Sequence, residues 1–511
     1  MNRRTFLAAA VSAAMLTGCA VGPDYNRPYV PVPKDYRHVR GEETDVNLLK
    51  ARWWTEYHDP NLDFFVSKAI ANNRTLQQTM ANVERAAAAL TTARANLFPQ
   101  LNYSGDLGKS KASLNTPTGA AMGDKPIKSY EVLATASWEI DLWGKIRRQT
   151  ESAQASLRAT EAAHRAAISS VIGSVISTYL SILMTEEQYK IAEETAESYH
   201  KTYQLFLLRF NHGNVSEMEV AQAWSQWESA MVQIPQIRQN RTELKNSLSI
   251  LTGVPVEDFP KPKALDELDV PDVVAGIPSQ LLEERPDVIQ AEEQLKAANA
   301  DIGAAKALYF PSISLSGGLG FSSDQLRELF KGPSKVWQYA GNISGPIFHW
   351  GAVTAGVRSA EAQQKALLAA YQLAVSTAFA DVDNALSRRQ NVIEELRSKR
   401  SLVMSLEDYS RLANAQYQGG YTGYFTVLQS LLPPQISLAE VKSRALNSVA
   451  QIYQALGGGW IDQALIEEQQ AIREIEEAEK LKKQSPAANQ AEPAPKPVDG
   501  EPVKLDTAKQ Q

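Results

Sequence analysis

The chain contains very little cysteine and histidine, and this scarcity excludes several classes of protein. Among its 511 residues there is one cysteine, Cys19, so no disulfide can form within the chain. The six histidines are scattered, and neither paired cysteines nor a His-Glu-x-x-His motif occurs. We therefore expect no metal site and no cofactor, and the absence of a catalytic constellation argues against an enzyme.

An excess of positive charge and long apolar runs are also missing. The formal net charge is −6 at pH 7, which gives no basic footprint for nucleic acid. Beyond Cys19 no uninterrupted apolar run reaches the roughly 18 residues of a membrane-spanning helix. Any further contact with a membrane must therefore use amphipathic segments or β-strands.

The first residues have the pattern of a lipoprotein signal. Two arginines precede an apolar run over residues 6–16, as in secretory signal peptides. The run ends in Leu16-Thr17-Gly18-Cys19-Ala20, which resembles the lipobox of bacterial lipoproteins, in which the cysteine becomes the acylated amino terminus. We expect a signal peptide over residues 1–18, lipidation at Cys19, and a lipid anchor with an extended tether over residues 19–60. The alternative is an ordinary buried thiol.

The chain is internally duplicated. Trp143-Gly144 returns as Trp350-Gly351, an offset of 207 residues (350 minus 143). Leu97-Phe98-Pro99 returns as Tyr309-Phe310-Pro311, an offset of 212 residues (309 minus 97). A repeat of about two hundred residues is too long for a solenoid unit and indicates a duplicated domain. We assign the first repeat to residues 61–260, the second to 261–460, and a charged, Pro- and Ala-rich disordered tail to 461–511.

Each half contains two segments in which the hydrophobic period changes from that of a helix to that of a strand. In residues 130–140 one face carries Tyr, Val, Ala, Ala, Trp and Ile, whereas the other face is mostly polar. Residues 101–107, 313–321 and 337–347 alternate in a similar way. The pattern predicts one hairpin per half, with strands of about ten residues, a length that suits a tilted crossing of a bilayer.

A very long helical segment follows each hairpin. Residues 143–211 and 350–418 are rich in Ala, Gln and Glu, and each would span about 100 Å at the rise of an α-helix. Glycine-marked turns come next, and shorter return helices are expected over about 215–251 and 422–456. Ala-rich helices of this length must pack against neighbours on more than one side.

Two short helices should match one long helix when they are stacked end to end, because roughly 55 Å for a return helix and roughly 50 Å for the helix before the hairpin add to about 100 Å. Pro235 and the pair Pro433-Pro434 are expected to kink or break the return helices. The predicted fold is α+β, with long antiparallel helices that form a helical barrel. Four strands are fewer than the roughly 8 of the smallest membrane barrels, so we expect three chains to share 12 strands, three times four.

Motifs in both halves point to one family. They are Trp138–Lys145 (WEIDLWGK), Glu284–Glu292 (ERPDVIQAE), Ile302–Pro311 (IGAAKALYFP) and Gly345–Gly351 (GPIFHWG). Through these motifs the chain resembles the TolC-type outer-membrane efflux lipoproteins over about residues 20–460. The resemblance implies a homotrimer in the cell outer membrane, in contact with its lipid, with one β-barrel and a helical tunnel in the periplasm. It also implies two partners, a periplasmic adaptor protein and an inner-membrane transporter of the RND type.

The glycine-marked turns are predicted to form the periplasmic tip, where the tunnel narrows and the adaptor docks. In the family an acidic residue in a Val-Leu-Asp-Ala pattern helps to form a constriction, whereas this chain has Val427-Leu428-Gln429-Ser430. Glu217 and Glu219 are candidate substitutes, the alternative being ordinary acids favoured at a helix start. The residues assigned to the tip and gate are Gly213, Glu217, Glu219, Gly419, Gly420, Gly423, Thr426 and Gln429.

Aromatic residues gather near the expected strand ends. They are Trp138, Trp143, Trp337, Tyr339 and Trp350. Trp and Tyr concentrate at the two interfaces of a membrane, so these five residues are predicted to form an aromatic belt. Ordinary packing is the alternative.

Three functions fit these observations. The first is the exit duct of a tripartite pump that exports drugs or other toxic small molecules, and the second is the same duct serving protein (type I) secretion. The third is a periplasmic coiled-coil scaffold without a pore. The alternating hairpins argue against the third, and the resemblance favours the first. Export of metal ions has no support from clusters of Met, His or Cys.

Overall fold

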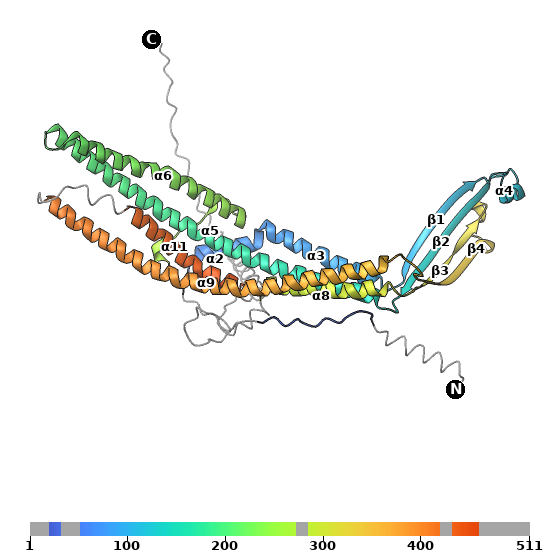
Figure 1. The fold of residues 1–511 in the computed structure, drawn as a ribbon. Coiled ribbons are helices and arrows are strands. Elements are labelled where there is room, and N and C mark those ends of the chain that lie inside the picture. Colours follow the sequence, from blue (N-terminus) through green and yellow to red (C-terminus); the bar gives the residue numbers. More distant parts are fainter. Residues whose placement is uncertain (1–19, 32–51, 272–284, 419–431, 459–511) are drawn as a thin grey trace, which may run out of the picture. The chain divides into compact units, whose positions relative to one another are not determined.

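The computed structural model describes residues 20–31, 52–271, 285–418 and 432–458. They fall within one compact unit, Met1–Ile461, shown in Figure 1. The helices are α2 (Pro60–Asn72), α3 (Arg74–Ala95), α4 (Pro117–Met122), α5 (Lys145–Asn211), α6 (Glu217–Thr252), α8 (Pro286–Ala307), α9 (Ala352–Gln418) and α11 (Leu432–Ala455). The strands are β1 (Gln100–Ser110), β2 (Ile127–Ile140), β3 (Ser312–Ser323) and β4 (Lys335–Ser344). The long helices and both hairpins are confirmed.

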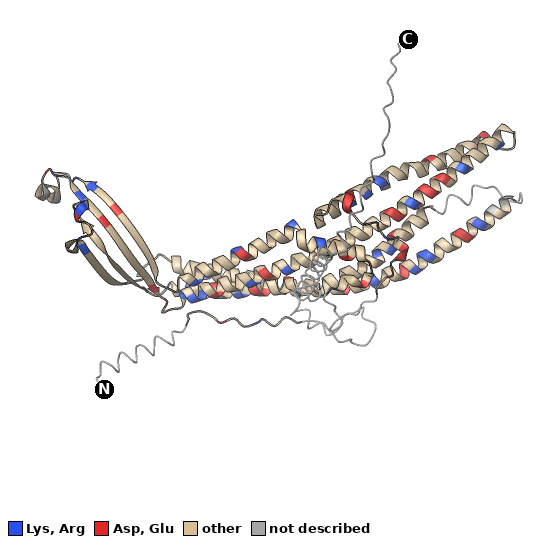
Figure 2. Ribbon diagram, turned by 180° about the vertical axis from the view of Figure 1, so that it is seen from behind, with Lys and Arg blue, Asp and Glu red and all other residues tan. Residues whose placement is uncertain are grey.

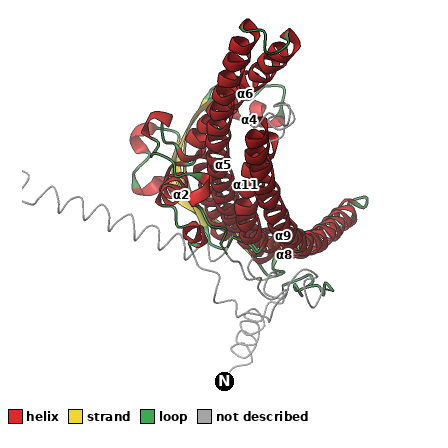
Figure 3. Cartoon of the chain, turned by 90° about the vertical axis from the view of Figure 1, so that its left-hand side faces the viewer, coloured by secondary structure: helices red, strands yellow, loops and turns green. Residues whose placement is uncertain are grey.

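Each long helix packs against a pair of shorter helices. Helices α8 and α11 both pack against α5 and against α9, while α3 and α6 pack against α5. Figures 1 and 3 show α8 and α11 following one another between the two long helices, with α6 on the other side of α5. The predicted stacking of two short helices beside one long helix is therefore confirmed.

The helix before the first hairpin is divided, which the periodicity did not reveal. Asn73 has extended backbone angles (φ −62°, ψ 126°) between α2 and α3. Its side-chain oxygen accepts hydrogen bonds from the backbone N–H groups of Thr75 (2.9 Å) and Leu76 (3.2 Å). Asparagine is a preferred N-cap residue, so it stops α2 and starts α3.

Of the predicted kink or break at Pro235, the break is wrong, because α6 continues through this residue. A proline removes one backbone hydrogen bond from a helix interior. Burial against neighbouring helices offsets this loss: Ile234 and Ala230 pack in one apolar cluster with Ala196 of α5. Pro433 and Pro434 lie in the first turn of α11, where N–H groups have no helical partner in any case.

Residues 53–57 belong to the core and not to an extended tether. They form a short 3₁₀ helix in which Trp53, Trp54 and Tyr57 are buried. The ring of Trp53 stacks on that of Tyr453 with centroids 4.6 Å apart, and the Tyr57 hydroxyl donates to the Leu446 carbonyl at 3.1 Å. Since three large aromatic side chains would be costly to expose, the tether predicted over 19–60 must end before them.

One window of α5 is apolar enough in composition to cross a membrane, although no uninterrupted run is that long. This 18-residue window has a mean hydropathy of 1.7, and 61% of it is buried inside the structure. The burial comes from the helices packed around α5. We therefore interpret the window as part of a core helix.

The four strands form one antiparallel sheet in the order β1-β2-β3-β4. Each hairpin comes from one repeat, and the β2–β3 pair joins the two hairpins. Consequently β1 and β4 lie at the two edges. Thr116 caps the short helix α4 in the connection between β1 and β2.

Candidate functional site: the sheet, the collar and the helical tip

One face of the sheet is apolar and the other is polar. Residues paired across neighbouring strands lie on the same face of the sheet, so the strand register shows which face each side chain occupies. The apolar face carries Leu101, Tyr103, Leu107, Val132, Trp138, Leu315, Leu319, Trp337, Tyr339 and Ile343, all exposed in the single chain. The opposite face carries Asn102, Ser104, Asp106, Glu131, Thr135, Ser314, Ser316, Gln338 and Asn342. An exposed apolar surface of this extent requires apolar surroundings.

The five predicted belt residues occupy different environments. Trp138 is two residues from the end of β2, Trp337 is two residues from the start of β4, and Tyr339 lies in the middle of β4. Trp350 is 89% exposed beyond the strands. Trp143 is half-buried: its ring stacks on Phe310 at 4.5 Å and its Nε1 donates to the Pro311 carbonyl at 2.8 Å. Packing accounts for Trp143, and the belt stays a prediction for the other four.

The connection from β2 to α5, here called the collar (residues 138–147), is built by the first motif. The Asp141 carboxylate accepts hydrogen bonds from the backbone N–H groups of Ile146 (3.0 Å) and Arg147 (2.9 Å), and so caps α5. Gly144 has a φ of +78°, which glycine adopts without strain. Lys145 pairs with Glu139 at 2.5 Å. These contacts of the motif hold the connection between β2 and α5, and they therefore fix the angle between the sheet and the helices.

Residues 20–31, here called the strap, lie against this collar. The Val21 N–H donates to the Trp143 carbonyl at 3.0 Å, and Asn299 of α8 donates to the Pro23 carbonyl at 2.9 Å. The strap approaches α8 so closely at Gly303 that an added Cβ there would lie 2.6 Å from the Val21 oxygen. Glycine in the Ile302–Pro311 motif thus permits backbone contact.

Charged side chains secure the strap further. The buried guanidinium of Arg148 donates to Asp24 of the strap at 2.7 Å. Arg27 pairs with Glu292 of α8 at 3.0 Å, and the Tyr25 hydroxyl donates to the same carboxylate at 3.3 Å. Cys19 itself lies outside the described residues, and the first described residue, Ala20, lies against Gly144 of the collar.

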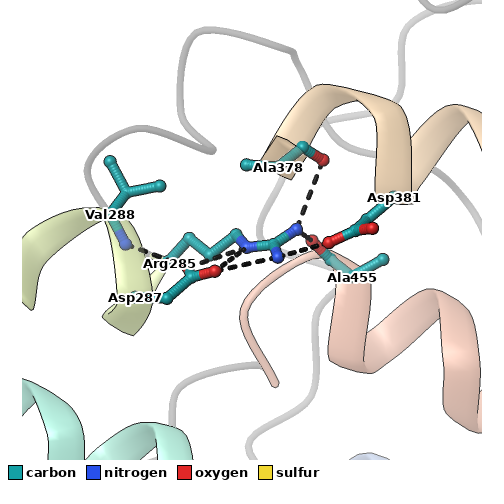
Figure 4. A network of polar contacts seen from close by, with 6 residues as sticks. All are labelled: Arg285, Asp287, Val288, Ala378, Asp381 and Ala455. Atoms are coloured by element: carbon teal, nitrogen blue, oxygen red, sulfur yellow. Dashed lines mark hydrogen bonds and ion pairs between the residues drawn. The ribbon is translucent and has the colours of Figure 1, made fainter. Parts of the chain in front are cut away.

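Arg285 of the second motif is the centre of a buried polar network, drawn in Figure 4. Its guanidinium pairs with Asp381 of α9 (2.6 Å) and Asp287 (2.8 Å) and donates to the carbonyls of Ala378 (3.2 Å) and Ala455 (3.0 Å). Burial lowers the pKa of the guanidinium, but hydrogen bonds from it to Asp287 and Asp381 outweigh burial and raise the pKa. Arg285 thus stays charged and joins the start of α8 to α9 and to the end of α11.

Asn73 makes the corresponding contact in the first half. Its side-chain amide donates to the carbonyl of Leu251, in the last turn of α6, at 2.8 Å. The side-chain amide of the neighbouring Asn72 donates to the carbonyl of Thr252 at 3.4 Å. In both halves, therefore, the residue at the N-cap position of the helix before the hairpin also binds the end of the return helix.

The tip of the first half is a tight turn between α5 and α6. Gly213 has a φ of +75°, and an added Cβ would meet nothing within 4 Å. Ser216 and Glu219 form a reciprocal capping box, in which the Glu219 carboxylate accepts from the Ser216 N–H at 2.7 Å. Glu219 therefore has a role at the helix start, while Glu217 is exposed in the first turn. The predicted gate residues of the second half, Gly419, Gly420, Gly423, Thr426 and Gln429, lie outside the described residues.

Sequence reasoning missed two features of the site and left a third without a role. The second motif marks Arg285 but does not show its partners, and neither the repeats nor the motifs assign a function to Asn73 or to the aromatic residues at 53–57. An asparagine followed by a helical pattern is a capping signal that could have located Asn73. Across the described ranges, no group of three His, Cys, Asp or Glu residues could hold a metal ion.

Comparison with known proteins identifies the class. The sequence profile of the family described as "Outer membrane efflux protein" matches residues 65–254 and 277–458. The chain belongs to this family of outer membrane proteins, whose members are channels and not enzymes.

Individual relatives extend over nearly the whole chain. The toluene efflux pump outer membrane protein TtgC of Pseudomonas putida is 33% identical over 479 residues, which cover 92% of this chain and 98% of TtgC. The probable outer membrane lipoprotein SilC of Salmonella typhimurium is 32% identical over 460 residues, covering 88% and 97%. The CmeC outer membrane channel of Campylobacter jejuni has a similar structure, with a TM-score of 0.81 and 28% identity over 88% of this chain and 98% of CmeC.

Proposed function

We propose that this chain is one third of the outer-membrane exit duct of a tripartite efflux pump. The observation that carries the proposal is the sheet, whose apolar face is exposed while its edges β1 and β4 have no further strand to pair with among the described residues. An open edge in lipid leaves backbone groups unsatisfied at several kcal/mol each, so β4 of one chain should pair with β1 of the next. Three chains then close a barrel of 12 strands, three times four.

The helices supply the rest of the duct. With 67 residues each, α5 and α9 span about 100 Å, far more than one membrane requires. We propose that the twofold pattern of the chain, over residues 61–260 and 261–460, places equivalent helices around one tunnel in the periplasm. The polar face of the sheet would continue the lining of this tunnel through the membrane.

The anchor is proposed to be lipid on Cys19, after removal of residues 1–18. The relative SilC is named as a lipoprotein, and the lipobox precedes a strap that is held at the collar by the Val21 and Asp24 contacts. Acyl chains contribute roughly 0.8 kcal/mol per buried methylene, so several chains would hold the collar at the membrane surface.

The tip opposite the sheet is proposed to be the gate and the docking end. The turn at Gly213 ends one of the longest helices, and the predicted residues Thr426 and Gln429 would lie at the matching turn of the second half. A periplasmic adaptor and an inner-membrane transporter of the RND type would engage this end. Its cargo would be drugs or other toxic small molecules, as the toluene efflux pump of TtgC suggests, and no feature of the described residues favours protein secretion instead.

Disulfide trapping tests the shared barrel. Within one chain β1 and β4 are three strand spacings apart, about 14 Å, which is too far for a disulfide. Cysteine at Tyr103 of β1, combined in turn with cysteine at Trp337, Tyr339 or Gly341 of β4, should therefore give covalent oligomers in at least one combination. Uncrosslinked chains in all three combinations would contradict the proposal, and cysteines at Tyr103 and Ala134 of β2, paired within the chain, control for oxidation.

A further inference from the structure

The charged residues of the four strands are sorted by sign between the two faces of the sheet. The register places Lys109, Lys128 and Lys335 on the apolar face. Asp106, Glu131 and Glu139 all lie on the polar face. Within these four strands the apolar face has no acidic residue and the polar face has no lysine or arginine.

All three lysines lie toward the end of the strands that is remote from the helices. Lys109 lies directly opposite Lys128, whereas Lys335 begins β4 opposite Phe321, whose other partner, Val132, is four residues nearer the helices than Lys128 (132 minus 128). Figure 2 shows blue bands at the end of the strands that is remote from the helices. Lys109 is nine residues beyond Gln100 (109 minus 100), which is about 30 Å along the strand and about 23 Å along the membrane normal at a tilt near 40°. Since the apolar band of a membrane barrel is about 25 Å tall, Lys109 and Lys128 lie at its far boundary, and Lys335 lies below them on the same face.

The fold itself gives these lysines no partner. All three are exposed, and none forms an ion pair within the part of the chain that the structure describes. Like charges directly opposite one another in a sheet are destabilising. By contrast, the loop residues Lys111 and Lys331 are paired with Asp124 (2.5 Å) and Glu328 (2.7 Å). An anion from outside the chain would remove the repulsion between Lys109 and Lys128.

We propose that Lys109, Lys128 and Lys335 bind the phosphate groups of an anionic lipid in the membrane leaflet remote from the helices. This rests on the proposed function, because it requires the apolar face to contact lipid. The acyl chains would lie against Leu107 and Trp337, just below the lysines. Each ammonium group is a compact charge with three N–H donors, which suits phosphate oxygens. The cationic rim and the apolar surface beneath it thus match the two parts of one amphiphile.

Native mass spectrometry of the full-length protein in detergent tests this inference, with diphosphoryl lipid A as the probe and fully dephosphorylated lipid A as the comparison. The test variant changes Lys109, Lys128 and Lys335 together to Gln. A matched variant changes the loop residues Lys111, Lys125 and Lys331 to Gln and so removes the same charge. A third variant, with Arg at the first three positions, keeps the charge.

The wild type, the loop variant and the Arg variant should bind the phosphorylated lipid, with weaker binding at high salt. The affinity of the sheet-lysine variant should fall roughly ten- to a hundred-fold, while its binding of the dephosphorylated lipid stays the same. If this triple variant does not assemble, Lys335→Gln alone should show a loss of about five-fold. Equal binding by wild type and sheet-lysine variants, or an equal loss in the loop variant, would overturn the inference. The oligomers and disulfides that test the shared barrel would be unaffected by that result.

Discussion

Asn73 and Arg285 occupy equivalent positions in the two halves of the chain, 212 residues apart (285 minus 73), and both bind the end of a return helix. Asn73 donates to the carbonyl of Leu251, and Arg285 donates to the carbonyl of Ala455. The same offset relates Leu97 to Tyr309. The duplication has therefore kept a junction between two stacked helices while the chemistry of the joining side chain diverged.

Arg285→Ala should destabilise the protein strongly. The change leaves the carbonyl groups of Ala378 and Ala455 and the Asp381 carboxylate without their buried cation, at a cost of about 3 kcal/mol. Unfolding midpoints in denaturant should record the loss. Arg444→Ala is the matched control, since it breaks an exposed pair with Glu395 and should cost less than about 1 kcal/mol. Similar midpoints for the two variants would contradict a central role for Arg285.

Arginine at Val132 should prevent or weaken assembly, and arginine at Thr135 should be milder. The register places Val132 on the apolar face and Thr135 on the polar face of the same strand. A charge on the lipid face near the middle of the membrane costs roughly 2 to 4 kcal/mol. Heat resistance of the oligomer on gels is the measurement. Loss of the oligomer in Thr135→Arg with retention in Val132→Arg would show that the assignment of the faces is inverted.

Stability should decline as the pH falls below about 6.5, in part because of His164. Burial lowers the pKa of this imidazole from its ordinary value of 6.5, and its Nδ1 lies 2.8 Å from the Thr79 hydroxyl. The unfolded chain therefore takes up a proton before the folded chain does, so the stabilisation present above pH 6.5 is lost on acidification. The difference between unfolding temperatures at pH 7.5 and pH 5 should shrink in His164→Asn. An unchanged difference would assign the pH dependence to other groups.

Cysteines introduced at Thr426 or Gln429 should lie close to the threefold axis at the tip. Bridging them between chains should block export, because the tunnel is proposed to open there, and reduction should restore it. Accumulation of a fluorescent pump substrate in cells measures the block, and a cysteine at the exposed Met218 near the other turn serves as a control. Efficient bridging without any change in export would show that this end is not the gate.

The elements that depend on local pattern could be predicted from the sequence. The alternation of apolar and polar residues predicted both hairpins, and the composition of residues 143–211 and 350–418 predicted the two long helices. Pro235 and the aromatic residues at 53–57 could not be interpreted correctly in this way, because neighbours distant in sequence determine both. The tolerance of α6 for a proline depends on packing against α5.

The residues of the site divide in the same way, between those that a local sequence pattern predicts and those that only the fold brings together. Gly213 and the capping box at Glu219 follow from short-range turn chemistry, and motif resemblance drew attention to Arg285. The partners of Arg285, at Ala378, Asp381 and Ala455, come from two other helices and could not be known before the fold. The sorting of lysines from acids likewise emerged only when the register aligned four strands from both repeats.

The number of chains in the detergent-solubilised particle tests the central claim most directly. Native mass spectrometry after removal of detergent should give the mass of three chains, each carrying lipid, because only three sets of four strands make the proposed barrel of 12. A stable particle of one or two chains, or a ring with another number, would contradict the proposal that this chain is one third of an outer-membrane duct.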